Sequence, residues 1–262
     1  MKLKGSDEWQ GRTDYADTFS KRAAGLLPEM ESSKAAAMLL EKEIVAGDSI
    51  LDVGCGAGHY LRSLRGKIKA DFRYTGVDAT EEFVDAAKQV WNQDSRSSFK
   101  VGSIYELPFQ DNEFDVVMCN NVLLHLPSIV KPIAELTRVA RRLILIRTLI
   151  GDRSFRVQEV FSKETWPFSS VPIEEEFDDS GEPTSFGYEN IYSRGYFESV
   201  LKRASPKADI RIIEDTFFDA DAINHSANTE GLPNATRVIS GMQTLGYILT
   251  PWCFVLVRLV GE

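Results

Sequence analysis

Short apolar runs alternate with amphipathic segments through the middle of the chain. Strand-like runs cover residues 49–53, 72–77, 99–101, 114–119 and 143–149, and helical patterns begin at residue 60 and cover 81–91 and 128–141. Strands that alternate with helices predict a parallel sheet with helices on both faces and a ligand site at the carboxyl ends of the strands. We therefore expect an α/β fold with a doubly wound, mostly parallel sheet.

The pattern differs at the two ends of the chain. Residues 1–44 are polar and helix-prone, with an apolar stretch from Ala35 to Leu40, and predict one or two leading helices. Regular alternation stops over 151–192 and 219–250, while Ser193 suits the N-cap of a further helix and 209–213 and 252–260 suit two late strands. We expect a single domain over 1–262, with leading helices or a lid (1–44), a binding core (45–150) and two insertions (151–192 and 219–250) that form a substrate cap.

Bulk composition narrows the class of partner and the compartment. The chain has 262 residues, 43% hydrophobic content, a formal charge of −9 and a pI near 5.0. This acidic balance argues against binding of nucleic acid through a broad basic face, although a local patch can survive it. The N-terminus lacks a signal-like apolar region and the longest apolar runs are strand-sized, so we expect a cytoplasmic protein without a membrane span. The three cysteines are scattered and suggest neither a disulfide framework nor a metal site.

A glycine-rich turn follows the first predicted strand. Residues 50–58 read Ile-Leu-Asp-Val-Gly-Cys-Gly-Ala-Gly, and glycines allow a backbone to approach a ligand closely. The third glycine comes one residue too early for the dinucleotide pattern, and no Lys-[Ser/Thr] follows as in a phosphate-binding P-loop. The acid at Asp52 would repel a phosphate but suits a cationic ligand. An ordinary tight turn between strand and helix is the alternative for this motif alone.

An acid followed by Gly-x-Gly-x-Gly after the first strand resembles the class I, Rossmann-like S-adenosylmethionine (AdoMet)-dependent methyltransferases, and among them the type 11 group. Two later segments strengthen the resemblance: Val101-Gly-Ser-Ile-Tyr-Glu-Leu-Pro-Phe and Phe114-Asp-Val-Val-Met-Cys-Asn-Asn. The resemblance covers about residues 45–150. It implies a seven-stranded sheet of the methyltransferase type, with AdoMet as cofactor and S-adenosylhomocysteine as product.

The resemblance also implies a set of cofactor-binding residues. Asp78 ends the second strand, where an acid can accept hydrogen bonds from both ribose hydroxyls, although it also precedes a helix that it could cap. The family commonly has an acid where this chain has Ser103, so recognition of adenine would depend more on shape, with Ile104 against the ring. The side-chain carbonyls of Asn120 and Asn121 could bind the methionine amine, or the residues could simply form a turn. The expected cofactor-binding residues are Asp52, Gly54, Cys55, Gly56, Gly58, Asp78, Ala79, Ser103, Ile104, Asn120, Asn121 and Tyr15.

Candidates for catalysis are few. Displacement at a sulfonium carbon needs alignment more than a catalytic side chain, but a hydroxyl or ammonium acceptor must lose a proton, for which His is the natural base. His125 lies just beyond the fourth strand and is the best-placed candidate; its alternative role is packing at the start of a helix. His59 suits the first turn of a helix, and His225 lies in the second insertion, where it could meet substrate. No metal ligand set is expected.

Aromatic residues mark a possible lid. Tyr15 and Phe19 lie in the leading segment, and the first insertion contributes Trp166, Phe168, Tyr188 and Tyr192. Such residues also serve simply to cover the core. The acidic run 174–179 would attract a cationic acceptor or remain a solvated loop.

The favoured function is methyl transfer from AdoMet to a small-molecule acceptor, at O, N or C. One alternative is methylation of RNA or protein, which the lack of a basic stripe disfavours. Another is a non-catalytic AdoMet-binding protein that regulates or scaffolds a partner. A nicotinamide oxidoreductase is disfavoured by the glycine spacing. The sequence does not indicate an oligomeric state.

Overall fold

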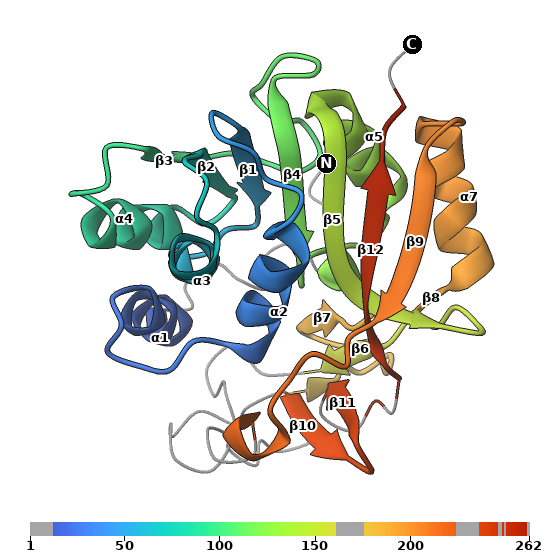
Figure 1. Ribbon diagram of the computed structural model, residues 1–262. Helices are drawn as coiled ribbons and strands as arrows, with labels where there is room; N and C mark the ends of the chain where they lie inside the picture. Colours follow the sequence, from blue (N-terminus) through green and yellow to red (C-terminus); the bar gives the residue numbers. More distant parts are fainter. Residues whose placement is uncertain (1–12, 161–175, 224–235, 246–247, 249, 261–262) are drawn as a thin grey trace.

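The computed structural model describes residues 13–160, 176–223, 236–245, 248 and 250–260. Its central element is a sheet whose strands follow the predicted alternation (Figure 1). The strands are β1 (Ser49–Val53), β2 (Arg73–Asp78), β3 (Ser97–Val101), β4 (Phe114–Asn120), β5 (Ala140–Gly151), β8 (Tyr192–Ser193), β9 (Asp209–Glu214) and β12 (Trp252–Arg258). The helices are α1 (Thr13–Ala23), α2 (Glu31–Leu40), α3 (His59–Lys67), α4 (Glu81–Val90), η1 (Leu123–His125), α5 (Val130–Val139) and α7 (Arg194–Ala204).

Seven strands form the main path of the sheet, in the order β3-β2-β1-β4-β5-β12-β9, and β8 adds a short parallel pairing at the end of β5. The seven-stranded, mostly parallel sheet is therefore confirmed. The two late strands are present, as β9 and β12. In the structure β12 is antiparallel to both of its neighbours, so β9 has the same direction as β1 to β5. From β1, the strands β2 and β3 are added on one side of the sheet, and β4 and β5 are added on the other side. The strand order therefore reverses between β1 and β4, and open α/β sheets bind ligands at such a position.

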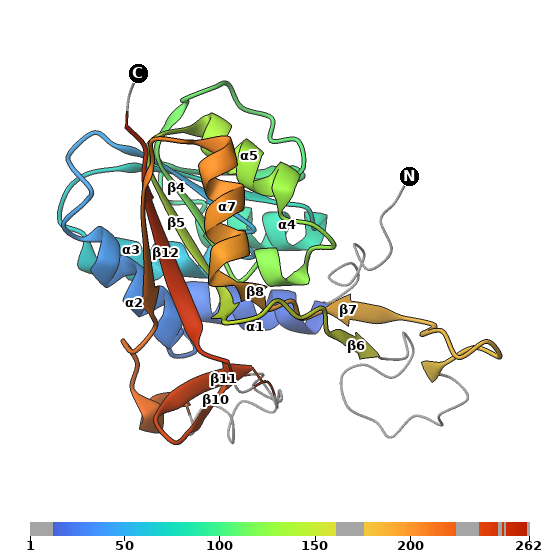
Figure 2. The same ribbon diagram turned by 90° about the vertical axis from the view of Figure 1, so that its right-hand side faces the viewer.

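Helices cover both faces of the sheet (Figure 2). One face packs on α5 and α7 through a core that includes Leu51, Val117, Ile144 and Phe197. The other face packs on α2, α3 and α4, whose Leu40, Leu61 and Val84 are fully buried. Because both faces are covered, β4 and β5 consist of nearly continuous apolar residues rather than alternating ones.

The segments expected to be irregular contain short antiparallel pairs beyond the carboxyl ends of the strands (Figure 1). In the first insertion β6 (Gln158–Val160) pairs with β7 (Phe186–Tyr188), and in the second β10 (Thr236–Ile239) pairs with β11 (Met242–Leu245). The N-cap prediction is confirmed, since Ser193 Oγ accepts a hydrogen bond from the backbone N–H of Tyr196. The insertions thus lie at the edge where the ligand site was expected.

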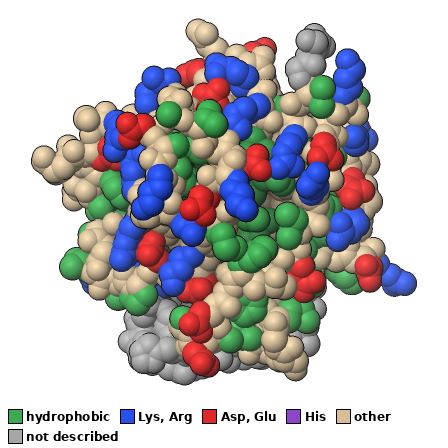
Figure 3. Space-filling model, in the orientation of Figure 1, with side chains coloured by type: hydrophobic (Ala, Val, Ile, Leu, Met, Phe, Trp, Pro, Cys, Tyr) green, Lys and Arg blue, Asp and Glu red, His purple; other side chains and the backbone are tan. Residues whose placement is uncertain are grey.

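Positive and negative side chains are interspersed over the face in Figure 3 rather than gathered into a stripe of one sign. Among the described residues, charged side chains form ion pairs such as those of Arg258 with Glu43 and of Lys67 with Glu41. Within the described residues no helix is long and apolar enough to cross a membrane.

Candidate functional site

The glycine turn between β1 and α3 has a conformation that depends on its glycines. Gly54, Gly56 and Gly58 have φ of +77°, +53° and +74°, in the left-handed region that other residues rarely adopt. The N–H groups of Gly54 and Cys55 donate to the carbonyl of Val77 on β2, at 2.7 and 3.1 Å. This arrangement ties the turn to the end of the neighbouring strand.

Side chains crowd the same glycines from three sides. A Cβ at Gly54 would lie 2.3 Å from Cγ2 of Val122, and one at Gly58 would lie 2.8 Å from Nε1 of Trp91. A Cβ at Gly56 would lie 3.3 Å from the ring of Phe19 on α1. The turn is therefore packed between the leading helix, α4 and the residues that follow β4.

Two carboxylates flank the turn. Asp52 is buried on β1 and accepts a hydrogen bond from Tyr74 Oη at 2.7 Å; burial raises the pKa of its carboxyl to about 7. Asp78 accepts from the backbone N–H of Gly56 and of Thr80, both at 2.9 Å, and burial raises its pKa as well. Asp78 thus braces the glycine turn against the start of α4, for which Thr80 occupies the N-cap position.

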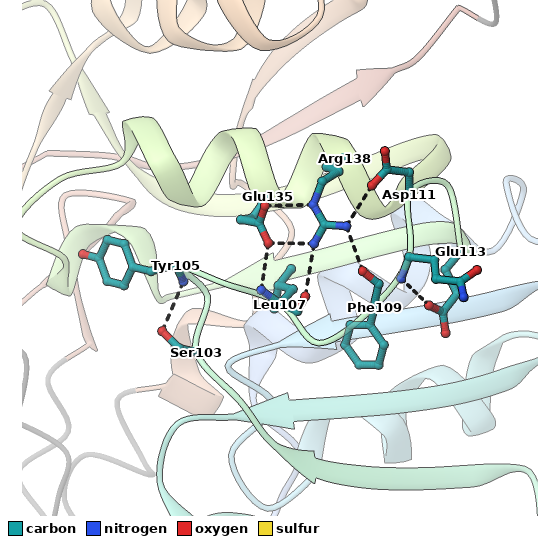
Figure 4. A network of polar contacts seen from close by, with 9 residues as sticks. Ser103, Tyr105, Leu107, Phe109, Asp111, Glu113, Glu135 and Arg138 are labelled. Atoms are coloured by element: carbon teal, nitrogen blue, oxygen red, sulfur yellow. Dashed lines mark hydrogen bonds and ion pairs between the residues drawn. The ribbon is translucent and has the colours of Figure 1, made fainter.

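The loop after β3 is held by one arginine (Figure 4). Arg138 on α5 donates to the carbonyls of Leu107 and Phe109 at 3.1 and 2.8 Å, and it pairs with Glu135, which also accepts from the Leu107 N–H at 2.8 Å. These contacts fix the segment after Ser103. Ser103 Oγ accepts from the Tyr105 N–H, while Ile104 is buried in the core beside it.

The two asparagines at the end of β4 have different surroundings. Asn120 is buried, and among the described residues neither its Nδ2 nor its Oδ1 has a hydrogen-bond partner. Asn121 has φ of +59° and is engaged on both sides: its Oδ1 accepts from Arg147 at 2.7 Å and its Nδ2 donates to Tyr60 Oη at 3.2 Å. Buried amides without partners are costly, so Asn120 is the group that a ligand would satisfy.

His125 lies in η1, against the first insertion. Its Nδ1 is 2.9 Å from the carbonyl oxygen of Tyr188 and 3.8 Å from Oε1 of Glu189. A carbonyl only accepts, so Nδ1 carries the hydrogen and the neutral ring has its lone pair on Nε2. The N–H of Asn190 donates to the Leu124 carbonyl, and Tyr192 Oη donates to the Leu123 carbonyl, so the insertion clamps η1.

The other two histidines differ from His125. His59 begins α3, as expected, and stacks on Phe19 with ring centroids 4.5 Å apart; burial lowers its pKa to about 3, so its ring stays neutral. His225 lies outside the described residues. So do Trp166 and Phe168 of the expected aromatic lid.

The other lid residues are described. Tyr15 lies one helical turn from Phe19 on α1, with ring centroids 5.7 Å apart. Helix α1 therefore covers the glycine turn. Tyr188 and Tyr192 are buried beside η1.

Two further candidates for cofactor binding, Cys55 and Ala79, lie in the turns after β1 and β2. Burial raises the pKa of the Cys55 thiol, which therefore stays protonated.

The sequence did not single out Glu189 or Arg147. Glu189 contacts His125 only because the first insertion folds back on η1. Arg147 is 2% exposed in the middle of an apolar strand, and this position was a usable signal, since a buried charge requires partners.

Residues 51–143 match the family model described as "Methyltransferase domain". An uncharacterized methyltransferase of Schizosaccharomyces pombe is 36% identical over 108 residues, which is 38% of this chain and 38% of that protein. The 27-O-demethylrifamycin SV methyltransferase of Amycolatopsis mediterranei is 33% identical over 138 residues, which is 52% of this chain and 44% of that enzyme.

The fold is also found in solved structures. A putative methyltransferase of Haloferax volcanii, solved in complex with the Trm112 methyltransferase activator, has a TM-score of 0.58 at 16% identity, covering 95% of this chain and 97% of that one. The chain spans less than half the length of the two curated relatives named above.

Proposed function

We propose that this chain, which belongs to the class I AdoMet-dependent methyltransferases, transfers a methyl group from AdoMet to a small-molecule acceptor. The amide of Asn120 carries the proposal. It is buried, it has no hydrogen-bond partner among the described residues, and it ends β4, next to the point where the strand order reverses. The 27-O-demethylrifamycin SV methyltransferase is named for a small molecule, which supports this class of acceptor.

The residues around the turn fit the cofactor. Asn120 would meet the amine and carboxylate of the methionine part, with the buried carboxylate of Asp52 nearby as the complement of its positive charge. Asp78 would accept from the ribose hydroxyls while it keeps its contacts with the backbone N–H groups of Gly56 and Thr80. Ser103 and Ile104 would border the adenine, on a loop that Arg138 holds in place. The side chain of Asn121 is engaged within the protein, so we assign it a supporting role.

His125 would act as the general base for a hydroxyl or ammonium acceptor. Bound AdoMet supplies a methyl group on a sulfonium, a good leaving group. The thioether of S-adenosylhomocysteine would leave as the carbon–sulfur bond breaks. Nε2 of His125 would take the proton from the acceptor, and the carbonyl of Tyr188 and the carboxylate of Glu189, which face Nδ1, would stabilise the resulting imidazolium. The first insertion would then both position the base and cover the acceptor.

Calorimetric titration with AdoMet, S-adenosylhomocysteine and NAD tests the cofactor. We expect binding of the first two ligands and none of NAD. Tight binding of NAD alone would overturn the proposal. Incubation with AdoMet and fractionated metabolites should then produce S-adenosylhomocysteine; binding without turnover on any fraction would favour a regulatory protein. A steep fall of turnover on bulk RNA with salt would instead indicate a nucleic acid substrate.

Asp78→Ala is expected to weaken AdoMet binding by about 1 to 3 kcal/mol, because two ribose hydroxyls lose a charged acceptor. Calorimetry measures the change. Asp85→Ala serves as the control, since Asp85 is an exposed acid on α4 that pairs only with Lys88 in the contacts the structure shows. Equal affinity of the Asp78 variant and wild type would leave Asp78 with only its role in bracing the turn.

AdoMet binding is expected to depend on pH through Asp52. The folded protein without ligand holds a proton on Asp52 up to about pH 7. A cation favours the ionised carboxylate, so binding releases this proton, and affinity falls as pH drops below 7, by at most about tenfold per pH unit. Above pH 7 the dependence disappears. His59 stays neutral through this range and does not contribute.

Titrations of wild type and Asp52→Asn at pH 5.5, 6.5 and 7.5 isolate this effect, because the amide cannot ionise. The variant should show a flatter profile than wild type. Parallel profiles for the two proteins would show that Asp52 is not coupled to the cofactor.

A further inference from the structure

We propose that Arg147 is a positioning residue that couples the β10–β11 hairpin to the segment Asn120 to Val122 at the end of β4. Gln243 is its contact on the hairpin. The inference rests on the proposed function, because the loop in question is the one after β4 that would hold AdoMet. According to this proposal, the second insertion contributes to cofactor binding by stabilising the end of β4, in addition to the contacts of the glycine turn and of Asp52 and Asp78.

Arg147 joins three separate parts of the chain. Its Nε donates to Asp215, after β9, at 2.8 Å, and its Nη2 donates to Oε1 of Gln243 on β11 at 3.1 Å. Its Nη1 donates to Oδ1 of Asn121 at 2.7 Å. The guanidinium also lies over the ring of Trp252, 4.1 Å from the centroid. A rigid planar group with donors on all sides holds its partners in one relative arrangement.

The contact with Asn121 reaches the glycine turn. Besides the side-chain bond, the Asn121 N–H donates to the Arg147 carbonyl at 2.9 Å, so Arg147 stabilises a residue in the left-handed conformation from both sides. The next residue, Val122, fills the space beside Gly54. A shift of Arg147 would therefore displace the segment Asn120 to Val122 and, through Val122, the glycine turn at Gly54.

Buried polar atoms without partners lie in and next to this cluster. Within the described residues, Nε2 of Gln243 and Nε1 of Trp252 are buried without hydrogen-bond partners, as are both amide atoms of Asn120. Gln243 and Trp252 are only 3% and 4% exposed. A buried donor without a partner is destabilising, and a ligand oxygen would relieve it. Arg147 thus links the hairpin residue Gln243 to Asn121, the neighbour of the unpartnered Asn120.

This arrangement makes cofactor binding and hairpin docking mutually dependent. A ligand that hydrogen-bonds the amide of Asn120 would hold Asn120 and Asn121 in place. The Oδ1 of Asn121 would then hold the guanidinium of Arg147, which donates to Oε1 of Gln243 on the hairpin. By linkage, the factor by which the ligand favours the docked hairpin equals the factor by which docking favours the ligand.

Hydrogen exchange of the full chain with and without S-adenosylhomocysteine tests the coupling. In wild type the ligand should slow exchange of amides 236–245 at least threefold. Gln243→Met has a similar length but no acceptor for Arg147, so it should lose this slowing and bind S-adenosylhomocysteine about three- to tenfold more weakly. Gln243→Glu restores an oxygen acceptor and should restore the slowing. Variants of Arg147 itself are avoided because they leave Asp215 buried without its charge partner.

Ile239→Ser provides the control, since Ile239 is on the same hairpin but is 42% exposed. It should retain both the slowing and the affinity. Equal slowing and equal affinity in Gln243→Met and wild type would overturn the coupling while leaving the proposed function intact. Loss of the slowing in Ile239→Ser as well would also overturn it, because the effect would not require Arg147. No binding of S-adenosylhomocysteine to wild type would overturn the proposed function itself.

Discussion

Replacing His125 by Asn should lower the turnover number of methyl transfer to a hydroxyl or ammonium acceptor by roughly 10²- to 10⁴-fold, the usual contribution of a general base. The amide of Asn can still donate to the Tyr188 carbonyl, so the packing of η1 is retained while the atom that accepts the proton is lost. Formation of S-adenosylhomocysteine under saturating AdoMet, with the acceptor identified by the metabolite screen, measures the effect.

Two comparisons separate this role from a structural one. Affinity for S-adenosylhomocysteine should stay within about twofold of wild type in His125→Asn, because His125 is assigned to the acceptor and not to the cofactor. Glu189→Gln should cause a smaller loss of turnover than His125→Asn, since Glu189 lies 3.8 Å from Nδ1 and acts through the histidine. Turnover of His125→Asn within threefold of wild type would return His125 to a packing role.

Gly54→Ala is expected to destabilise the fold by about 2 to 4 kcal/mol and to abolish most AdoMet binding. The left-handed φ of +77° costs roughly 1 to 2 kcal/mol for a residue with a Cβ. The remainder comes from the clash with Val122, whose Cγ2 would lie 2.3 Å from the new Cβ. Urea unfolding of the variant and wild type gives the difference in the free energy of unfolding.

Gly47→Ala is a matched control, because Gly47 has φ of +94° but no heavy atom within 4 Å of the position its Cβ would take. It should show only the conformational cost. The double variant Gly54→Ala/Val122→Ala removes the clash and should be less destabilised than the sum of its single variants. If Gly54→Ala were no more destabilised than Gly47→Ala, the prediction that the clash with Val122 adds to the conformational cost would be wrong.

Local patterns predicted the core well. The first strand has the same bounds in the sequence prediction and in the structure, and the other core strands agree to within a few residues. Ser193 caps its helix as expected. These features depend on neighbours in the chain: period-two or continuous apolar runs, a cap three residues before its N–H donor, and glycines at turns. The direction of β9 is set by the path of the chain through the first insertion and α7, which local patterns do not specify.

The candidate site was predicted only in part. The sequence singled out Asp52, Asp78 and the two asparagines as candidates because they lie at or near the ends of strands, but it treated Asn120 and Asn121 as equivalent. The structure separates them: Arg147 and Tyr60 engage the amide of Asn121, whereas among the described residues that of Asn120 has no partner. Distant partners such as Glu189 for His125 leave no local trace in the sequence.

The sequence by itself determined the sheet, the glycine turn and the class of cofactor, because each is specified by residues close together in the chain whose types leave few alternatives. Only the tertiary structure decided that Arg147 unites Asp215, Gln243 and Asn121, that Val122 closes on Gly54 and that the first insertion supports His125. Such contacts join residues up to about a hundred positions apart. They depend on how segments that are distant in the chain pack against one another, which no periodic pattern in the sequence specifies.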